Sequence, residues 1–231
     1  MKTAKSVLIS ELKKMGFQRK GNVCFRIIDD LICLIGFEKP SSMLYVHFAI
    51  MPVYYPCNGV ILYSFGNRLN NVYADFPSLT DVVIQEQIDF WCKKLLTYIE
   101  TEILPQMQQI STAKRMSDFF SANRGKKYYF TSKWAKKDNY FSKCFFCSPD
   151  KLLSLHVYAS LYAKEYESCF SLANQYISVL QKNNIYTQKL KEQRIKEMQF
   201  IIDLILNKDF KQIEQFTTEI VEENLQIFSC K

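Results

Sequence analysis

Residues 23–37, which read VCFRIIDDLICLIGF, decide the fold of the N-terminal part of the chain. Two apolar runs, 23–28 and 31–37, flank the polar pair Asp29-Asp30. Short apolar runs that are rich in Ile and Val and separated by a two-residue polar turn are typical of a β-hairpin. We therefore expect two antiparallel strands here, at the beginning of a sheet.

A third strand is predicted at 44–51, where side chains of two kinds alternate. One face would carry Tyr45, His47, Ala49 and Met51, and the other Leu44, Val46, Phe48 and Ile50. This alternation is typical of a sheet covered on one side, with His47 pointing away from the apolar face. Residues 17–21 read as a basic turn before the hairpin, and 59–65 as a fourth strand.

Amphipathic helices flank the predicted strands. Apolar residues at helical spacing predict a helix over 3–15, with Gly16 as its C-cap, and a long helix over 81–104 that Pro105 ends or kinks. The long helix is well placed to cover the apolar face of the sheet. A shorter helix would follow over 111–120, with Ser111 as N-cap.

The last third of the chain has helical periodicity throughout. We expect four helices, near 149–163, 166–182, 187–206 and 209–225. KEYESC at 164–169 aligns with KDFKQI at 208–213 at an offset of 44 residues. In αα-hairpin repeats an aromatic after an acidic turn packs between paired helices, which would explain Tyr166 and Phe210 by one kind of contact.

Together these patterns predict an α+β fold, in which an N-terminal antiparallel sheet covered by helices is followed by an all-helical region of about four helices. We divide the chain into an α+β domain at 1–122, a basic aromatic connector at 123–148 and a helical domain at 149–231. The two αα-hairpins of the helical domain would cap the α+β domain or present a groove to a peptide.

The positive charge of the chain is concentrated in its middle. Overall there are 30 Lys and Arg against 23 Asp and Glu, a net charge of +7. Residues 1–110 have a net charge of +1, residues 111–150 of +6 and residues 151–231 of 0. A local excess of this kind concentrates an anionic partner.

Within that middle part, residues 124–143 interleave seven cations with six aromatic rings. Cations hold phosphates and rings stack on bases, so the composition suits a single-stranded nucleic acid. The alternatives are rings buried in the core beside solvated lysines, or an acidic protein partner. The candidate nucleic-acid or anion-binding residues are Arg124, Lys126, Lys127, Tyr128, Tyr129, Lys133, Trp134, Lys136 and Lys137.

The N-terminal half also carries a family resemblance. Residues 12–22, LKKMGFQRKGN, place a Gly-Phe turn after a helix and then a basic Gly-Asn step, and residues 31–39 close a hairpin with Phe-x-Lys. In these features the chain resembles a bacterial family known as domain of unknown function 4304. The resemblance covers roughly the first 120 residues. Because that family has no established activity, it implies a fold and no catalytic residues.

No signature of a phosphate-binding loop, dinucleotide site, zinc protease or serine hydrolase occurs in the sequence. His47 is a conceivable general base, oriented by Asp29, Asp30 or Glu38, but a lone His beside carboxylates more often has a structural role. We name no catalytic residue. A further candidate for anion binding is the set of cations around the first hairpin, Arg19, Lys20 and Arg26.

The eight cysteines are scattered through apolar patterns, and most are expected to be small core residues. Cys144 and Cys147 form the one close pair, and no second pair follows to complete a zinc site. His156 lies in an apolar helical run and is expected to be packed. We expect neither a metal nor a cofactor.

The sequence is best interpreted as a non-catalytic binding protein that recognises another macromolecule, with a protein as the expected partner. A bacterial immunity or adaptor role suits this form. The alternative function is binding of single-stranded nucleic acid through 124–143, and an enzyme that uses His47 ranks last. We expect a cytoplasmic protein that neither spans nor binds a membrane, because no apolar run approaches 20 residues and no secretory signal is present.

Overall fold

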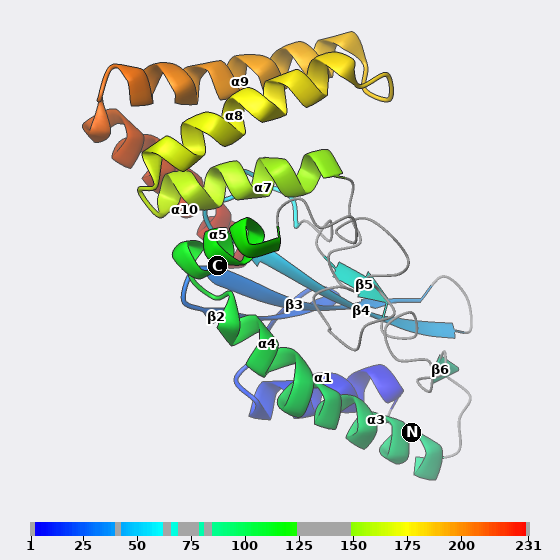
Figure 1. Ribbon diagram of the computed structural model, residues 1–231. Coiled ribbons are helices and arrows are strands. Elements are labelled where there is room, and N and C mark those ends of the chain that lie inside the picture. The colour runs from blue at the N-terminus through cyan, green and yellow to red at the C-terminus, as the bar shows by residue number, and fades with distance from the viewer. Residues whose placement is uncertain are drawn as a thin grey trace.

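The computed structural model describes residues 3–39, 43–61, 66–68, 79–80, 85–123 and 149–229. They form an α+β structure in which an antiparallel sheet near the N-terminus is followed by helices (Figure 1). The predicted fold class is confirmed. The division into an α+β domain, a connector and a helical domain stays a prediction.

The sheet has the strand order β1-β2-β3-β4-β5, and the short β6 also pairs with β4. Its strands are β1 (Gln18–Lys20), β2 (Val23–Ile28), β3 (Leu31–Glu38), β4 (Met43–Pro52), β5 (Gly66–Arg68) and β6 (Leu79–Thr80). The hairpin β2–β3 has the expected register, with Ile28 opposite Leu31. Asp29 has a φ of 50°, so the two-residue turn uses the left-handed region in which Asp is better tolerated than most residues.

Two short strands differ from the sequence-based expectation. Residues 17–21 were predicted to be a turn, but they contain β1, which pairs with β2 through a second hairpin in which Lys20 is opposite Val23. The connecting residues are Gly21, with a φ of 59°, and Asn22, so the Gly-Asn pair is the hairpin turn. β1 escapes prediction because its three side chains are all exposed and show no apolar alternation.

The fourth strand was predicted at 59–65, and a strand that pairs with β4 is found at Gly66–Arg68. Residues 59–61 belong to no strand, because Asn58 and Gly59, which has a φ of 73°, form a turn, and residues 62–65 lie outside the described part of the chain. Gly66 lies so close to β4 that a Cβ there would come within 1.9 Å of the Phe48 carbonyl oxygen. Only glycine permits this approach of two backbones.

The long helical segment does not end at the proline. It runs as α3 (Gln85–Tyr98), a π-helical turn η1 (Ile99–Ile103) and α4 (Leu104–Gln109). Pro105 has no N–H group and would crowd a carbonyl of the preceding turn, and the wider turn immediately before it provides the needed space. Of the two predicted alternatives, that Pro105 ends the helix is wrong; the segment instead changes its helical geometry just before this residue.

The hairpin turn between β2 and β3 holds the start of α5 (Ala113–Asn123). The carboxylate of Asp30 accepts a hydrogen bond from the Ala113 N–H at 2.9 Å, and Asp29 accepts one from the Ser111 hydroxyl. Ser111 was expected to be the N-cap, but this helix begins two residues later. Here the orphan N–H of a helix start is satisfied by a residue 83 positions earlier in the chain.

Four helices follow residue 148, as predicted. They are α7 (Pro149–Tyr162), α8 (Tyr166–Lys182), α9 (Gln188–Leu206) and α10 (Phe210–Phe228). The aligned segments begin with the same turn, because Lys164 and Lys208 have φ values of 61° and 53°. The rings that follow, Tyr166 and Phe210, stack on one another at 4.9 Å between centroids. The two segments thus repeat the same turn geometry. Their aromatic rings do not make two equivalent contacts but pack against each other.

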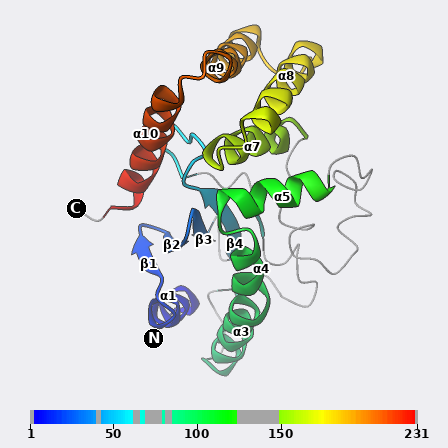
Figure 2. The ribbon, with the colours of Figure 1, turned by 60° about the vertical axis from the view of Figure 1, so that its left-hand side comes forward.

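Both sides of the sheet are covered along β3. All seven residues from Leu31 to Phe37 are buried, and successive side chains of a strand point to opposite faces. The prediction of a sheet covered on one side is therefore wrong. The helices α1 (Ala4–Lys14) and α3–α4 lie on one side, and the layer α7–α10 lies on the other (Figures 1 and 2).

The α7–α10 layer is attached to the sheet by buried contacts. The ring of Phe228 on α10 lies 4.8 Å from that of Phe25 on β2, and Tyr162 on α7 stacks on Tyr54 at 5.2 Å. Asn224 on α10 is 0% exposed and donates at 2.7 Å to each of the Val53 and Tyr55 carbonyls. These contacts join residues more than 100 positions apart into one core.

Cysteines within the described residues are core side chains, as expected: Cys24, Cys33, Cys57, Cys92 and Cys169 are all buried and free. His156 is also packed as predicted, with its Nε2 atom 3.3 Å from the Ser121 hydroxyl. Over the described ranges, every helix is too short or too polar to cross a lipid bilayer.

Candidate functional site

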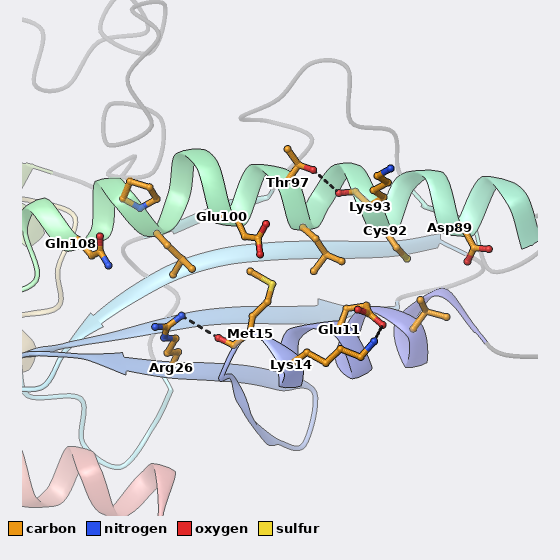
Figure 3. A pocket seen from close by; sticks show the side chains of 14 residues that line it. Glu11, Lys14, Met15, Arg26, Asp89, Cys92, Lys93, Thr97, Glu100 and Gln108 are labelled. Carbon is orange, nitrogen blue, oxygen red and sulfur yellow. Dashed lines mark hydrogen bonds and ion pairs between the residues drawn. The ribbon is translucent and has the colours of Figure 1, made fainter.

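A groove of about 840 Å³ lies between α1 and the α3–η1–α4 segment, next to β2 (Figure 3). It is open to solvent. The lining side chains come from α1 and β2 on one side and from the long helical segment on the other. They are Val7, Glu11, Lys14, Met15, Arg26, Asp89, Cys92, Lys93, Leu96, Thr97, Glu100, Leu104, Pro105 and Gln108.

The lower wall of the groove in Figure 3 consists of the last two turns of α1 and part of β2. Lys14 and Glu11 form an ion pair at 2.7 Å. Arg26 on β2 is half-buried, and its Nη1 atom donates to the Met15 carbonyl oxygen at 3.1 Å. This contact places a guanidinium at the carboxyl end of α1, where the helix dipole favours positive charge.

The upper wall extends from Asp89 to Gln108, which is roughly 28 Å along a helix. Asp89, Lys93 and Glu100 are exposed on it. Glu100 belongs to the π-helical turn η1, and such turns occur often at functional sites. α1 and α3 come close where the Cys92 thiol is 4.0 Å from the Ala4 carbonyl oxygen.

The electrostatics of the groove are balanced. Its lining has three carboxylates, from Glu11, Asp89 and Glu100, and three cations, from Lys14, Arg26 and Lys93. The one thiol in the lining is Cys92, and its burial, with Asp89 as the next cause, raises its pKa to about 12. A thiol with such a pKa is protonated at neutral pH and is a poor nucleophile. The lining is therefore equipped for polar contacts with a large ligand.

The three cations proposed for anion binding at the hairpin are not brought to one point. Arg19 and Lys20 are neighbours on β1, so they point to opposite faces of the sheet. Arg19 donates to the Gly21 carbonyl oxygen at 2.8 Å, Lys20 donates to the Ile227 carbonyl oxygen at the end of α10, and Arg26 donates to Met15. Each cation thus binds a backbone carbonyl, and anion binding by them stays a prediction.

The other predicted site residues, Arg124 to Lys137 of the basic aromatic segment 124–143, lie outside the described residues, as do Cys144 and Cys147. Their role stays a prediction. Among the described residues, no group of three or more His, Cys, Asp or Glu side chains is arranged to hold a metal ion.

His47 has one of its three predicted carboxylate neighbours. Its Nε2 atom lies 2.9 Å from the Glu38 carboxylate, which is also 3.6 Å from Arg68. Asp29 and Asp30 are at the opposite end of β3, bound to the start of α5. An enzymatic role for His47 stays a prediction.

Sequence reasoning missed the groove. Its charged residues read as the solvated faces of two amphipathic helices, 3–15 and 81–104, and no spacing in the sequence shows that these faces line one groove. The signal that was available is Pro105, because a proline within a helical pattern often marks a local change of helix geometry.

Comparison with known proteins gave no match: no family model, no curated protein and no solved structure matches the chain. The resemblance of the first 120 or so residues to the family of unknown function stays a prediction.

Proposed function

We propose that this chain is a non-catalytic binding protein and that it binds another protein in the groove between α1 and α3–α4. We place it in the bacterial cytoplasm, in an immunity or adaptor role. The observation that carries the proposal is the groove itself: long, open and lined by equal numbers of positive and negative side chains.

The charge pattern favours a polypeptide over a nucleic acid at this place. A nucleic acid presents a continuous row of negative phosphates, which Glu11, Asp89 and Glu100 would repel. A polypeptide can match both signs with its own side chains, and such complementarity contributes chiefly to specificity and to the rate of association. A length of roughly 28 Å also fits an extended segment of about eight residues or a helix of about 19.

The composition of the groove is also unlike that of an enclosed substrate pocket. Its volume is continuous with solvent, and its exposed charges are held by flexible side chains such as Lys93. Acid–base or nucleophilic catalysis needs groups with perturbed pKa values in a site that excludes water, and here the perturbed group is a thiol that burial makes inert.

The experiment is a capture assay with a charge-exchanged groove. In the double variant Lys93→Glu, Glu100→Lys, the net charge of the protein is unchanged but two charges of the upper wall exchange places. The control variant Lys211→Glu, Glu222→Lys makes the same exchange at exposed positions on α10. Each purified protein is immobilised, exposed to lysate with and without nuclease, and the retained proteins are quantified by mass spectrometry.

We expect wild type and the α10 control to retain the same proteins, with and without nuclease, and the groove variant to lose at least one of them about tenfold. Equal retention by all three proteins would refute binding in the groove. Loss of all retained proteins on nuclease treatment would favour the alternative, nucleic-acid binding through 124–143.

That alternative rests on the seven cations and six aromatic rings of residues 124–143. It has its own signature, because binding that depends on the release of counterions falls steeply with salt. Affinity for single-stranded DNA or RNA should drop at least about tenfold between 50 and 300 mM salt, by the same counterion argument. Salt-independent affinity, or no binding, would exclude it.

A further inference from the structure

A second hollow lies within the α7–α10 layer, where α7, α8 and α9 meet the segment after β4. Its volume is about 310 Å³, which is at the lower end of the range for small-molecule sites. It is more enclosed than the α1–α3 groove. Its lining residues are Tyr55, Pro56, Asn58, Ser154, Tyr158, Tyr176, Leu190, Gln193, Arg194 and Glu197.

Arg194 on α9 contributes a fixed positive charge. Its Nη1 atom donates to the Tyr176 hydroxyl at 2.9 Å, and its guanidinium lies 4.7 Å from the centre of the Tyr186 ring. The carboxylate of Asp150 is 3.8 Å away, at the edge of ion-pair distance. Because Tyr176 is 1% exposed, it holds the guanidinium at the wall of the hollow.

Glu197, one turn further along α9, contributes a fixed negative charge. Its Oε1 atom accepts a hydrogen bond from the Tyr158 hydroxyl. Tyr158 is buried, and this burial, together with the Glu197 carboxylate, raises its pKa well above its usual range. The phenol is therefore a hydrogen-bond donor at every physiological pH, and its hydrogen bond fixes the position of the Glu197 carboxylate.

These two opposite charges do not neutralise one another. Side chains three residues apart on a helix are neighbours, and Arg and Glu at this spacing commonly pair. The structure describes both side chains and records no ion pair between them. Arg194 is bound instead to Tyr176 and pairs with Asp150, and Glu197 is bound to Tyr158. The hollow thus has a positive and a negative group held apart on one wall.

We propose that this hollow binds a small zwitterion, of which a free amino acid is the simplest example. The ligand carboxylate would bind Arg194, and its ammonium group would bind Glu197. The rings of Tyr55 and Tyr158, which meet edge to face at 5.5 Å, supply faces that attract a cation. A simple anion could pair only with Arg194 and a simple cation only with Glu197, whereas a molecule with both charges pairs with both groups. The proposal is independent of the groove.

The test is titration calorimetry of the full chain with matched probes. The zwitterions are alanine, leucine and 4-aminobutyrate; the singly charged counterparts are propionate, 4-methylpentanoate and propylamine. We expect at least one zwitterion to bind about tenfold or more tightly than its counterparts, since each lost charge pair at a partly buried site costs at least about that factor.

Two variants on α9 locate the binding. Glu197→Gln keeps an acceptor for the Tyr158 hydroxyl but removes the charge, and it should weaken zwitterion binding about tenfold or more. Glu192→Gln removes a charge from an exposed position of the same helix and should leave binding unchanged. Circular dichroism checks that both variants fold. If Glu197→Gln does not fold, the comparison of zwitterions with singly charged probes on the wild-type protein tests the proposal.

Three results would overturn the proposal: no zwitterion binding up to 10 mM ligand, equal binding of zwitterions and singly charged probes, or undiminished binding to a folded Glu197→Gln variant. None of these results bears on the capture assay, because Lys93 and Glu100 line a different hollow.

Discussion

The two helical layers that flank the sheet are built differently. The α7–α10 layer is joined to the sheet side by buried side chains, including Asn224, which is 0% exposed and binds two backbone carbonyls. The other layer, formed by α1 and α3–α4 and called here the α1–α3 layer, packs its apolar side chains on the sheet but leaves a charged groove between its helices. The first arrangement stabilises the fold, and the second exposes charged side chains such as Lys93 and Glu100 to solvent along a groove.

The largest expected effect comes from three buried thiols, one in the sheet and one in each helical layer. Burial raises the pKa of Cys33, Cys92 and Cys169 to about 12, against 9.0 for a free thiol. The folded state therefore keeps these protons above pH 9 while the unfolded state loses them, so stability is complete below pH 9 and falls as the pH rises towards 12. Each thiol contributes a loss of about 1.4 kcal/mol per pH unit.

Urea unfolding at pH 8 and pH 10 measures this loss, which should be roughly 4 kcal/mol for the three thiols together. Cys92 is in the α1–α3 layer and Cys169 in the α7–α10 layer. Cys92→Ala and Cys169→Ala should each reduce the loss by the contribution of one thiol, about 1.4 kcal/mol. A free energy of unfolding that stays constant from pH 8 to pH 10 would show that the thiols are not buried as described.

The next largest effect tests the contact between α10 and the sheet side. Asn224→Ala removes both hydrogen bonds to the Val53 and Tyr55 carbonyls and leaves these groups without their partner, so we expect a loss of about 3 kcal/mol in the free energy of unfolding. Asn174→Ala is the matched control, because Asn174 is exposed and bonds within its own helix. A loss below 1 kcal/mol for Asn224→Ala, by the same denaturation measurement, would contradict the proposed importance of this contact.

A smaller effect is expected where the hairpin turn caps α5. Asp30→Ala removes the acceptor for the Ala113 N–H and should cost about 1 kcal/mol, the usual value of an N-cap. Asp118→Ala on the exposed side of α5 should change stability by less than about 0.5 kcal/mol. Thermal unfolding followed by circular dichroism compares the two, and equal melting temperatures would mean that Asp30 has no capping role.

The smallest effect is expected in the groove. The exchange Lys93→Glu, Glu100→Lys should change the free energy of unfolding by less than about 0.5 kcal/mol, because both side chains are exposed. Denaturation in urea tests this. A loss of 2 kcal/mol or more would show that the groove charges hold the fold together, and the contrast between the two layers would disappear.

Most of the regular structure could be predicted from the sequence, because it follows from strong periodicity. The β2–β3 hairpin and the four C-terminal helices were expected within a few residues of their observed bounds. The three exposed residues of β1 and the approach of Gly66 to β4 could not be predicted, since neither leaves an apolar pattern. The positions of β1 and Gly66 follow from pairing with β2 and β4, whose own apolar patterns predict them as strands.

The candidate site could be predicted only in part. The sequence directs attention to 124–143, which lies outside the described residues, and to Arg19, Lys20 and Arg26, of which Arg26 lines the groove. The groove charges could not be recognised, because a charged residue on an amphipathic helix is usually just solvated. What makes Lys93 and Glu100 candidates is the second helix opposite them, and that is a tertiary feature.

The most direct test of the account is amide hydrogen exchange of the chain with and without a protein retained in the capture assay. If the groove is the binding site, exchange will slow on complex formation at 7–15 and 89–108, while the amides of α8 and α9 will keep their rates. If protection appears on the α7–α10 layer instead, and the amides of 89–108 exchange as in the free protein, the account is contradicted.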